Sequence, residues 1–263
     1  HLRELFTSRV AKVGMTDGIR QVLQEESDAL RAYYEQAGIL IARPVGGTSC
    51  RLAISAKGGT NAENHNHNDV GSYAVALGSE TMVGDQGGPN SYPGDYLNGD
   101  APQKYKIKGS FGHPAPVVDG RTQSSGGKAK GVVLQKEFTN EKDVFSIDYT
   151  SAYSTPNLDK LIRTFVYDRQ GKGSFTVGDE FTAKTPIRFE TAITTRADWK
   201  ILDDTHLLLA TDSEQMIVAI EASGKVAFTS ETIEVNSPAY TRIGIALKNQ
   251  SKEGYIRLKM YTK

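Results

Sequence analysis

The sequence predicts a mainly β protein, in the form of a large antiparallel β-sandwich that follows a short helical N-terminal segment. Two observations predict this fold. From residue 38 onward, short apolar or alternating runs recur at close spacing, bounded by Gly, Pro and Ser, as is typical of strands. After residue 36, no stretch has strong helical periodicity. We therefore expect a helical segment over residues 1–36 and a sandwich domain over residues 37–263, which is long enough for one large core.

The first residues carry apolar side chains at helical spacing, in two successive stripes. The first stripe consists of Leu2, Leu5, Phe6, Val10 and Val13. The second follows Asp17, which suits an N-cap, and consists of Ile19, Val22, Leu23, Leu30, Tyr33 and Tyr34. We expect both stripes to be helical.

The remaining elements are predicted strands in two groups. The first group comprises residues 38–44, 50–56 and 72–77. An irregular stretch over residues 84–128 follows, and loops of that length are usually functional or disordered. The second group comprises residues 131–138, 144–149, 161–167, 173–178, 187–195, 206–211, 214–222, 226–230, 241–247 and 254–261. Many short strands at such regular spacing favour an antiparallel sandwich.

Charge and cysteine content exclude several classes of protein. The chain has 31 basic and 31 acidic residues, which gives no support for a nucleic-acid partner or an anionic membrane surface. Cys50 is the only cysteine, so neither an intrachain disulfide nor a thiolate zinc cluster can form. No apolar run approaches the roughly 20 residues that span a bilayer. The sequence begins at His1 without a signal peptide, and we expect it to be a piece of a longer chain.

The segment "GGTNAENHNHNDVGSY", residues 58–73, concentrates groups that can bind metal or transfer protons. His65, His67 and Asp69 stand on alternate positions, and the whole chain has five histidines. If the segment is extended, these side chains project to the same side. Two imidazoles can then share one metal ion, or one can bind metal while the other faces a substrate. A His-x-His pair by itself is more often a solvated loop.

Two later residues extend this pattern to a zinc site. Asp85 follows an apolar run just before a glycine turn, and His113 stands at another turn. Zinc takes imidazole nitrogen and carboxylate oxygen as ligands, so His67, Asp85 and His113 would leave a fourth position for water or substrate. Each residue alone is an ordinary turn residue.

A cupin metal site is one alternative. Gly59, His65, His67 and Gly78 match the cupin spacing, but Gly71 stands where a cupin has its glutamate ligand. The loss of a metal ligand argues against a cupin-like metalloenzyme.

Three blocks resemble the C-terminal β domain of the heparinase II/III family of polysaccharide lyases. These blocks are "YYEQAGILIARP", "KGGTNAENHNHNDVGSYAVALGSETMVGDQGG" and "SFGHPAPVVDGRTQ", and the resemblance covers roughly residues 33–127. It implies a sandwich paired with an N-terminal (α/α) toroid, in enzymes that cleave acidic polysaccharides by β-elimination. Residues 1–36 would then contain the link to that toroid. The resemblance also implies a bacterial periplasmic or secreted protein. The sequence is compatible with a homodimer.

The resemblance assigns roles to the matched residues. It implies zinc ligands at His67, Asp85 and His113, with His65 facing the cleft for proton transfer. In the related lyases the toroid supplies the catalytic tyrosine and the group that neutralises the uronate carboxylate. We therefore expect this chain to be inactive without its toroid.

Five further residues are candidates on chemical grounds. Asp69 can orient an imidazole or cap a turn. Tyr92 and Tyr96 can stack on sugar rings, while Arg121 and Gln123 can meet an anionic sugar, although ordinary loop and hairpin positions would explain all four. The main functional alternative is a non-catalytic carbohydrate-binding or assembly module that has kept the fold without the chemistry.

Overall fold

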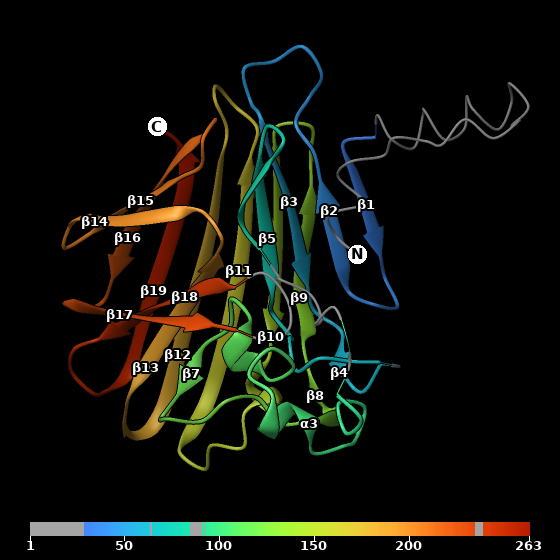
Figure 1. Cartoon of the computed structure of the whole chain (residues 1–263), viewed down its shortest axis with the longest axis vertical. Coiled ribbons are helices and arrows are strands. Elements are labelled where there is room, and N and C mark those ends of the chain that lie inside the picture. The colour runs from blue at the N-terminus through green and yellow to red at the C-terminus, as the bar shows by residue number, and fades with distance from the viewer. Residues whose placement is uncertain (1–28, 64, 85–90, 92, 235–238) are drawn as a thin grey trace, which may run out of the picture.

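The computed structural model describes residues 29–63, 65–84, 91, 93–234 and 239–263, and almost all regular structure in these ranges is β (Figure 1). The strands are β1 (Arg31–Tyr34), β2 (Ile39–Ala42), β3 (Leu52–Lys57), β4 (Thr60–Asn61), β5 (Tyr73–Leu77), β6 (Glu80–Val83), β7 (Val117–Val118), β8 (Gly126–Lys130), β9 (Val132–Phe138), β10 (Lys142–Asp148), β11 (Leu158–Asp168), β12 (Ser174–Ile187), β13 (Phe189–Thr195), β14 (Asp198–Asp203), β15 (His206–Ala210), β16 (Gln215–Ala222), β17 (Val226–Ile233), β18 (Tyr240–Leu247) and β19 (Ser251–Thr262). The helical turns are α3 (Ala101–Lys104), η1 (Ser110–Gly112) and η2 (Thr150–Ala152).

The described strands pair antiparallel in four sheets. The largest sheet has eight strands in the order β14-β15-β16-β19-β12-β11-β10-β9. A five-stranded sheet has the order β1-β2-β3-β5-β6, and a four-stranded sheet has the order β17-β18-β13-β7. β4 and β8 form a small two-stranded sheet. The prediction of a mainly β, antiparallel fold is confirmed.

The five-stranded and four-stranded sheets lie over one face of the eight-stranded sheet (Figure 1). They are linked to each other where the amide of Gly84 donates to the carbonyl of Thr194 at 3.0 Å. Between the layers, the ring of Tyr73 on β5 meets the rings of Phe165 on β11 and Phe175 on β12, with centroids 6.2 and 5.9 Å apart. Residues from all three sheets form one continuous apolar core, whose burial is the main stabilising contribution.

Side-chain alternation explains the long strands of the large sheet. Along β12, Phe175, Val177 and Phe181 face the core, and the residues between them are more exposed. Asp179 occupies a core-facing position in the same pattern and is 1% exposed. A buried carboxylate needs a partner, and Arg163 on the neighbouring strand β11 provides one.

The structure corrects the helical prediction at residues 31–34. This segment is the strand β1, in which Tyr33 pairs with Leu40 of β2. The Tyr33 ring packs edge-on against Phe138 and Phe145, with centroids 5.7 and 5.8 Å away. Hairpin pairing with β2 and packing against aromatic rings distant in sequence therefore override the local helical spacing. The other predicted helical positions, apart from Leu30, lie outside the described residues.

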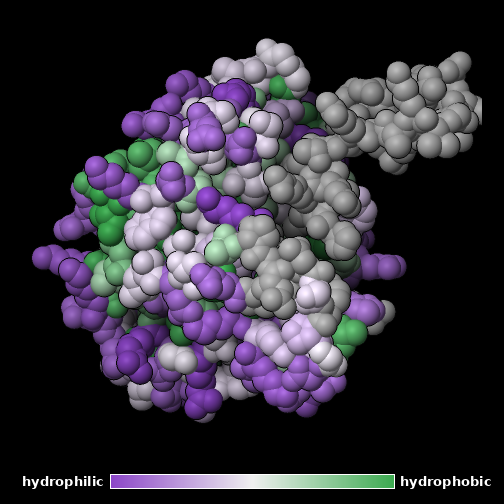
Figure 2. Space-filling view, in the orientation of Figure 1, coloured by the Kyte–Doolittle hydropathy of each residue, from purple (hydrophilic) through white to green (hydrophobic). Residues whose placement is uncertain are grey.

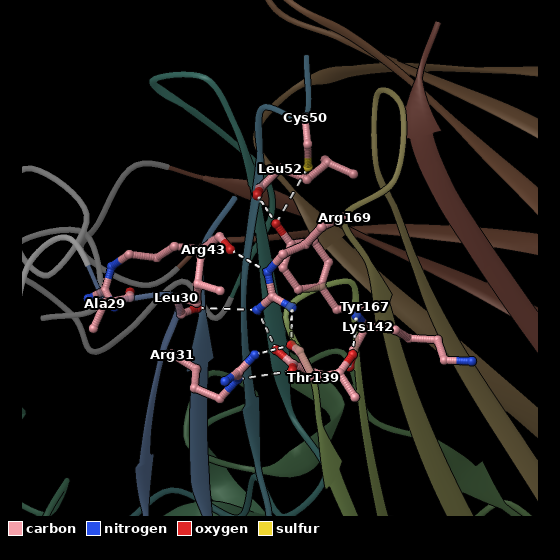
Figure 3. Close-up of polar contacts among 11 residues, drawn as sticks. Ala29, Leu30, Arg31, Arg43, Cys50, Leu52, Thr139, Lys142, Tyr167 and Arg169 are labelled. Carbon is pink, nitrogen blue, oxygen red and sulfur yellow. Dashed lines mark hydrogen bonds and ion pairs between the residues drawn. The ribbon is translucent and has the colours of Figure 1, made fainter. Parts of the chain in front are cut away.

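A buried polar cluster fastens the beginning of β1 to the sandwich (Figure 3). Arg169 is 3% exposed and donates to the carbonyls of Arg43 at 2.7 Å and Leu30 at 3.2 Å. It also pairs with Asp143, whose other oxygen accepts from Arg31 at 3.0 Å. The cluster fixes the point at which the described chain enters the fold.

The surface is mostly hydrophilic, with apolar colour gathered near the edge where β14 lies (Figure 2). Ile201 and Leu202 on that strand are 43% and 45% exposed. In the described ranges, no helix combines the length and apolar character needed to cross a membrane.

Candidate functional site

The irregular stretch after β6 brings His113 to the segment that contains His67. The one-turn helix η1 places His113 at its end, where the side chain is 1% exposed. His67 follows a turn and is half-buried. The two rings lie edge to face with centroids 5.2 Å apart, and Nδ1 of His67 is 3.2 Å from Nε2 of His113. Two residues 46 positions apart thus point ring nitrogens at one place.

Tyr96 supports this pair from the loop between β6 and α3. Its hydroxyl lies 3.2 Å from Nε2 of His67, and the residue is 1% exposed. The ring also packs on Tyr105, with centroids 5.4 Å apart, and lies under the ammonium of Lys108 at 4.9 Å. This buried position differs from the sugar-stacking position that the sequence suggested. A hydrogen bond from Nε2–H to Tyr96 would make Nδ1 of His67 the nitrogen that can accept a hydrogen bond or bind a metal ion.

The separation of the two histidine nitrogens suits ligands of one zinc ion, and it suits a direct hydrogen bond between the rings equally well. Zn–N bonds of about 2.0–2.1 Å at a tetrahedral angle place two ligand nitrogens about 3.3 Å apart. The observed separation of Nδ1 and Nε2 is 3.2 Å. Among the residues that the structure describes, no group of three His, Cys, Asp or Glu side chains could hold a metal ion. The predicted third ligand, Asp85, lies outside those residues, as does Tyr92.

His65 occupies a different environment from His67. It lies in a turn with φ +57°, a left-handed conformation that is uncommon for a residue other than glycine. The expectation of an extended segment, with both histidines on one side, is therefore wrong at this position. The exposed side chain of His65 lines a surface cleft of about 350 Å³, together with Asn66, Asn68 and Lys108.

The remainder of the cleft is polar. Its other lining residues are Asn61, Glu63, Leu97, Asn98, Gly99, Pro102 and Ser125. Lys108 is 6% exposed, and burial lowers the pKa of its ammonium below the ordinary value. The lysine donates to the carbonyl of Tyr96, so it connects the cleft to the residue that supports His67. Lys108 was not among the predicted residues, because no motif marks it. The cleft asparagines were not predicted either, although asparagine is frequent between residues 61 and 68.

Asp69 has a different partner from the imidazole that we predicted. Its carboxylate accepts from Nζ of Lys57 at 2.6 Å, and the residue is 7% exposed. Its carbonyl accepts from the amide of Ser72 at 2.9 Å, which closes a turn. Asp69 thus fixes the end of the histidine segment through an ion pair and a turn.

Gln123 is buried beneath the segment that contains His67 and forms hydrogen bonds with it. A sugar contact would require a surface position, which Gln123 does not occupy. It is 4% exposed, and its amide oxygen accepts from the Val70 amide at 3.1 Å and from Asn61 at 3.0 Å. Its amide nitrogen donates to the Val70 carbonyl at 2.7 Å. Arg121, two residues earlier, is exposed.

The fold is that of one domain of known polysaccharide lyases. The chain superposes on a crystal structure of heparinase III with a TM-score of 0.69 and 19% identity, over 88% of this chain and 36% of that one. It superposes on the heparan sulfate lyase HepC from Pedobacter heparinus with a TM-score of 0.71 and 13% identity, over 92% of this chain and 39% of that one. A mutant of the same lyase gives a TM-score of 0.73 at 14% identity, over the same shares of the two chains.

The chain therefore spans well under half the length of these structures. No protein-family model and no curated protein matches the sequence. At these identities the superpositions define the fold, which confirms the structural resemblance to heparinase-type lyases.

Proposed function

We propose that this chain is the zinc-containing β domain of a polysaccharide lyase that cleaves uronic-acid-containing polysaccharide by β-elimination. The observation that carries the proposal is the 3.2 Å approach of Nδ1 of His67 to Nε2 of His113 beside the cleft lined by His65. The fold shared with heparinase III supports the same conclusion.

The reaction explains why the cleft needs a histidine and a cation. β-Elimination removes the proton at C5 of a uronate, expels the oxygen at C4 and leaves a double bond between C4 and C5. The C5 proton becomes acidic when positive charge or hydrogen bonds neutralise the neighbouring carboxylate. Imidazole is a frequent general acid–base group in enzymes, and His65 is the imidazole that lines the cleft. Lys108 places a positive charge in the same cleft.

His67 and His113 have a structural role in this proposal. Zinc, with His67, His113 and Asp85 as its ligands, would fix the two loops that border the cleft. Tyr96 would hold the His67 ring in the required tautomer through its hydroxyl. Proton transfer is assigned to His65, so the metal supplies order rather than chemistry.

The proposed enzyme is larger than this chain. The chain spans 36–39% of the lyase structures that share its fold, so we place an (α/α) toroid before it in the full-length protein. That toroid would supply the catalytic tyrosine and the main neutraliser of the uronate carboxylate. We further propose a bacterial periplasmic or secreted location and an acidic polysaccharide as the partner.

Metal analysis tests the core of this proposal. We expect about one zinc per purified chain and a lower melting temperature after chelation, because structural zinc contributes free energy of folding directly. If the protein is expressed in zinc-replete medium and carries no bound zinc after purification, the metal site is refuted.

A non-catalytic carbohydrate-binding module is the second candidate. The asparagine-rich lining of the cleft favours this candidate, because side-chain amides can form hydrogen bonds with sugar hydroxyls without catalysing a reaction. The two candidates differ in the full-length protein: a lyase releases an unsaturated uronate product, whereas a binding module retains oligosaccharide unchanged. The cupin-like alternative loses support because Gly71 has a structural reason to be glycine, with φ +82°.

A further inference from the structure

Among the described residues, Arg163 has the largest fully buried side chain, and it lies outside both the proposed zinc ligands and the cleft. It contacts the backbone of the loop that contains His67 and of the loop that contains His113. It lies on β11 and is 0% exposed. Its Nη1 donates to the carbonyl of Gly71 at 2.7 Å and to the carbonyl of Pro114 at 2.7 Å. Pro114 directly follows His113, and Gly71 ends the segment that begins at His67.

The remaining donors of the guanidinium bind one buried carboxylate and one hydroxyl. Nε and Nη2 donate to the two oxygens of Asp179 at 2.7 and 2.6 Å, a bidentate pair. Nη2 also donates to Thr191 at 3.1 Å. All five N–H groups of the side chain are therefore used, two of them on the loops. Burial disfavours the charged form, but the Asp179 carboxylate together with Tyr149 and Tyr73 outweighs this effect, so the pKa of Arg163 lies above its ordinary value.

The carboxylate is itself held in place by further hydrogen bonds. Tyr149 donates to one oxygen of Asp179 and Thr191 to the other, both at 2.7 Å. The guanidinium also lies 5.5 Å from the ring centre of Tyr73 and 5.7 Å from that of Tyr149. Strands of both layers thus fix the Arg163 head group, and a fixed head group can set the distance between the two loops.

We infer that Arg163 is a positioning residue that holds the His67 and His113 loops at the separation required for metal binding. The inference rests on the proposed zinc site. A lysine at this position keeps a charge for Asp179 but has three donors on one nitrogen, so it cannot bind the carboxylate at two points and both carbonyls together.

The experiment compares Arg163→Lys with a matched variant, Arg169→Lys. Arg169 is also buried, also pairs with a carboxylate and also donates to backbone carbonyls (Figure 3). It lies six residues further along the chain, about 20 Å away at the rise of a strand. Zinc affinity is measured by chelator competition, and the ring nitrogens of all histidines are observed by NMR in the metal-free proteins.

We expect Arg163→Lys to weaken zinc binding by about 10–100-fold, the usual effect of losing a residue that orients metal ligands. It should also shift the ring signals of His67 and His113. Arg169→Lys should lower the melting temperature while leaving zinc affinity within about twofold and both ring signals in place. Equal effects of the two variants on affinity and ring signals would refute the inference.

Two provisions keep the test decisive. If Arg163→Lys does not fold, Thr191→Val removes one bond from the same head group and should shift the same two ring signals. The control is Thr164→Val, on the strand β11 that also carries Arg163. This change breaks a hydrogen bond to Ser146 and should not shift the two ring signals. If the wild-type protein binds no zinc, the proposed function is refuted. The NMR signals of the His67 and His113 rings in the variants then show whether Arg163 positions the two loops.

Discussion

At the scale of single residues, His65 and His67 are two positions apart and lie in different environments. His67 approaches His113 and Tyr96 with ring nitrogens, whereas His65 is exposed in the cleft. The difference arises from the left-handed backbone conformation of His65, which no residue pattern in the segment predicts. The separate roles proposed for the two histidines rest on this difference in environment.

Substitution of each histidine tests this division. His67→Ala should abolish stoichiometric zinc and lower the melting temperature. His65→Ala should keep about one zinc per chain, because its ring makes no part of the proposed site, and in the full-length enzyme it should reduce turnover about 10²–10⁴-fold if it transfers the proton. Zinc content of the two purified variants is the measurement. Loss of zinc from the His65 variant alone would reverse the assignment, and loss from both would make both residues ligands.

The buried supports of the site could not be foreseen from the sequence. Tyr96 and Gln123 were candidates for sugar contacts, but both are buried and hydrogen-bonded to the histidine segment or its neighbours. Lys57 replaces an imidazole as the partner of Asp69. These contacts join residues brought together only by the tertiary fold, so residue type alone does not distinguish a sugar contact from a brace.

At the scale of elements, the sequence predicted the strands in which apolar and polar residues clearly alternate. It did not predict the short strands that form only through contacts with other elements. β11, β12 and β19 alternate because one face packs on the core. β4 and β7 have two residues each, and β1 was assigned to a helix. β4 and β7 form because strands distant in sequence offer hydrogen bonds, whereas β1 pairs with the neighbouring β2 and packs on distant aromatic rings. A local sequence pattern does not indicate these contacts.

The turn at Gly71 gives an element-scale prediction. Its φ of +82° costs a residue with a Cβ about 1–3 kcal/mol. An added Cβ would be in ordinary van der Waals contact with Tyr149 at 3.4 Å and Arg163 at 3.6 Å, so the backbone strain would arise directly beside Arg163. Gly71→Ala should therefore destabilise the chain and weaken zinc binding. Gly47→Ala is the matched control, because Gly47 has φ +76° with nothing near its Cβ. Denaturant unfolding and zinc titration of both variants are the measurements. If the Gly47 variant weakens zinc binding equally, the turn at Gly71 has no special link to the site.

At the scale of the whole molecule, the sandwich presents a cleft lined by His65 and Lys108. The described residues that line the cleft include no tyrosine. Lyases of the same fold are more than twice as long, and the present chain superposes on only one part of them. The resemblance identified from three sequence blocks therefore predicted the fold, and the second domain that it implies stays a prediction.

The last prediction concerns activity. The isolated chain should release no appreciable unsaturated uronate from a panel of uronic-acid polymers, because elimination needs the carboxylate neutralised as the C5 proton leaves. The full-length protein with its toroid should release it, and absorbance of the unsaturated product measures both. Zinc content and melting temperature of the isolated chain serve as controls that it is folded and loaded. Turnover by the isolated chain at the full-length rate would show that His65, Lys108 and the rest of this domain suffice, and it would overturn the two-domain proposal.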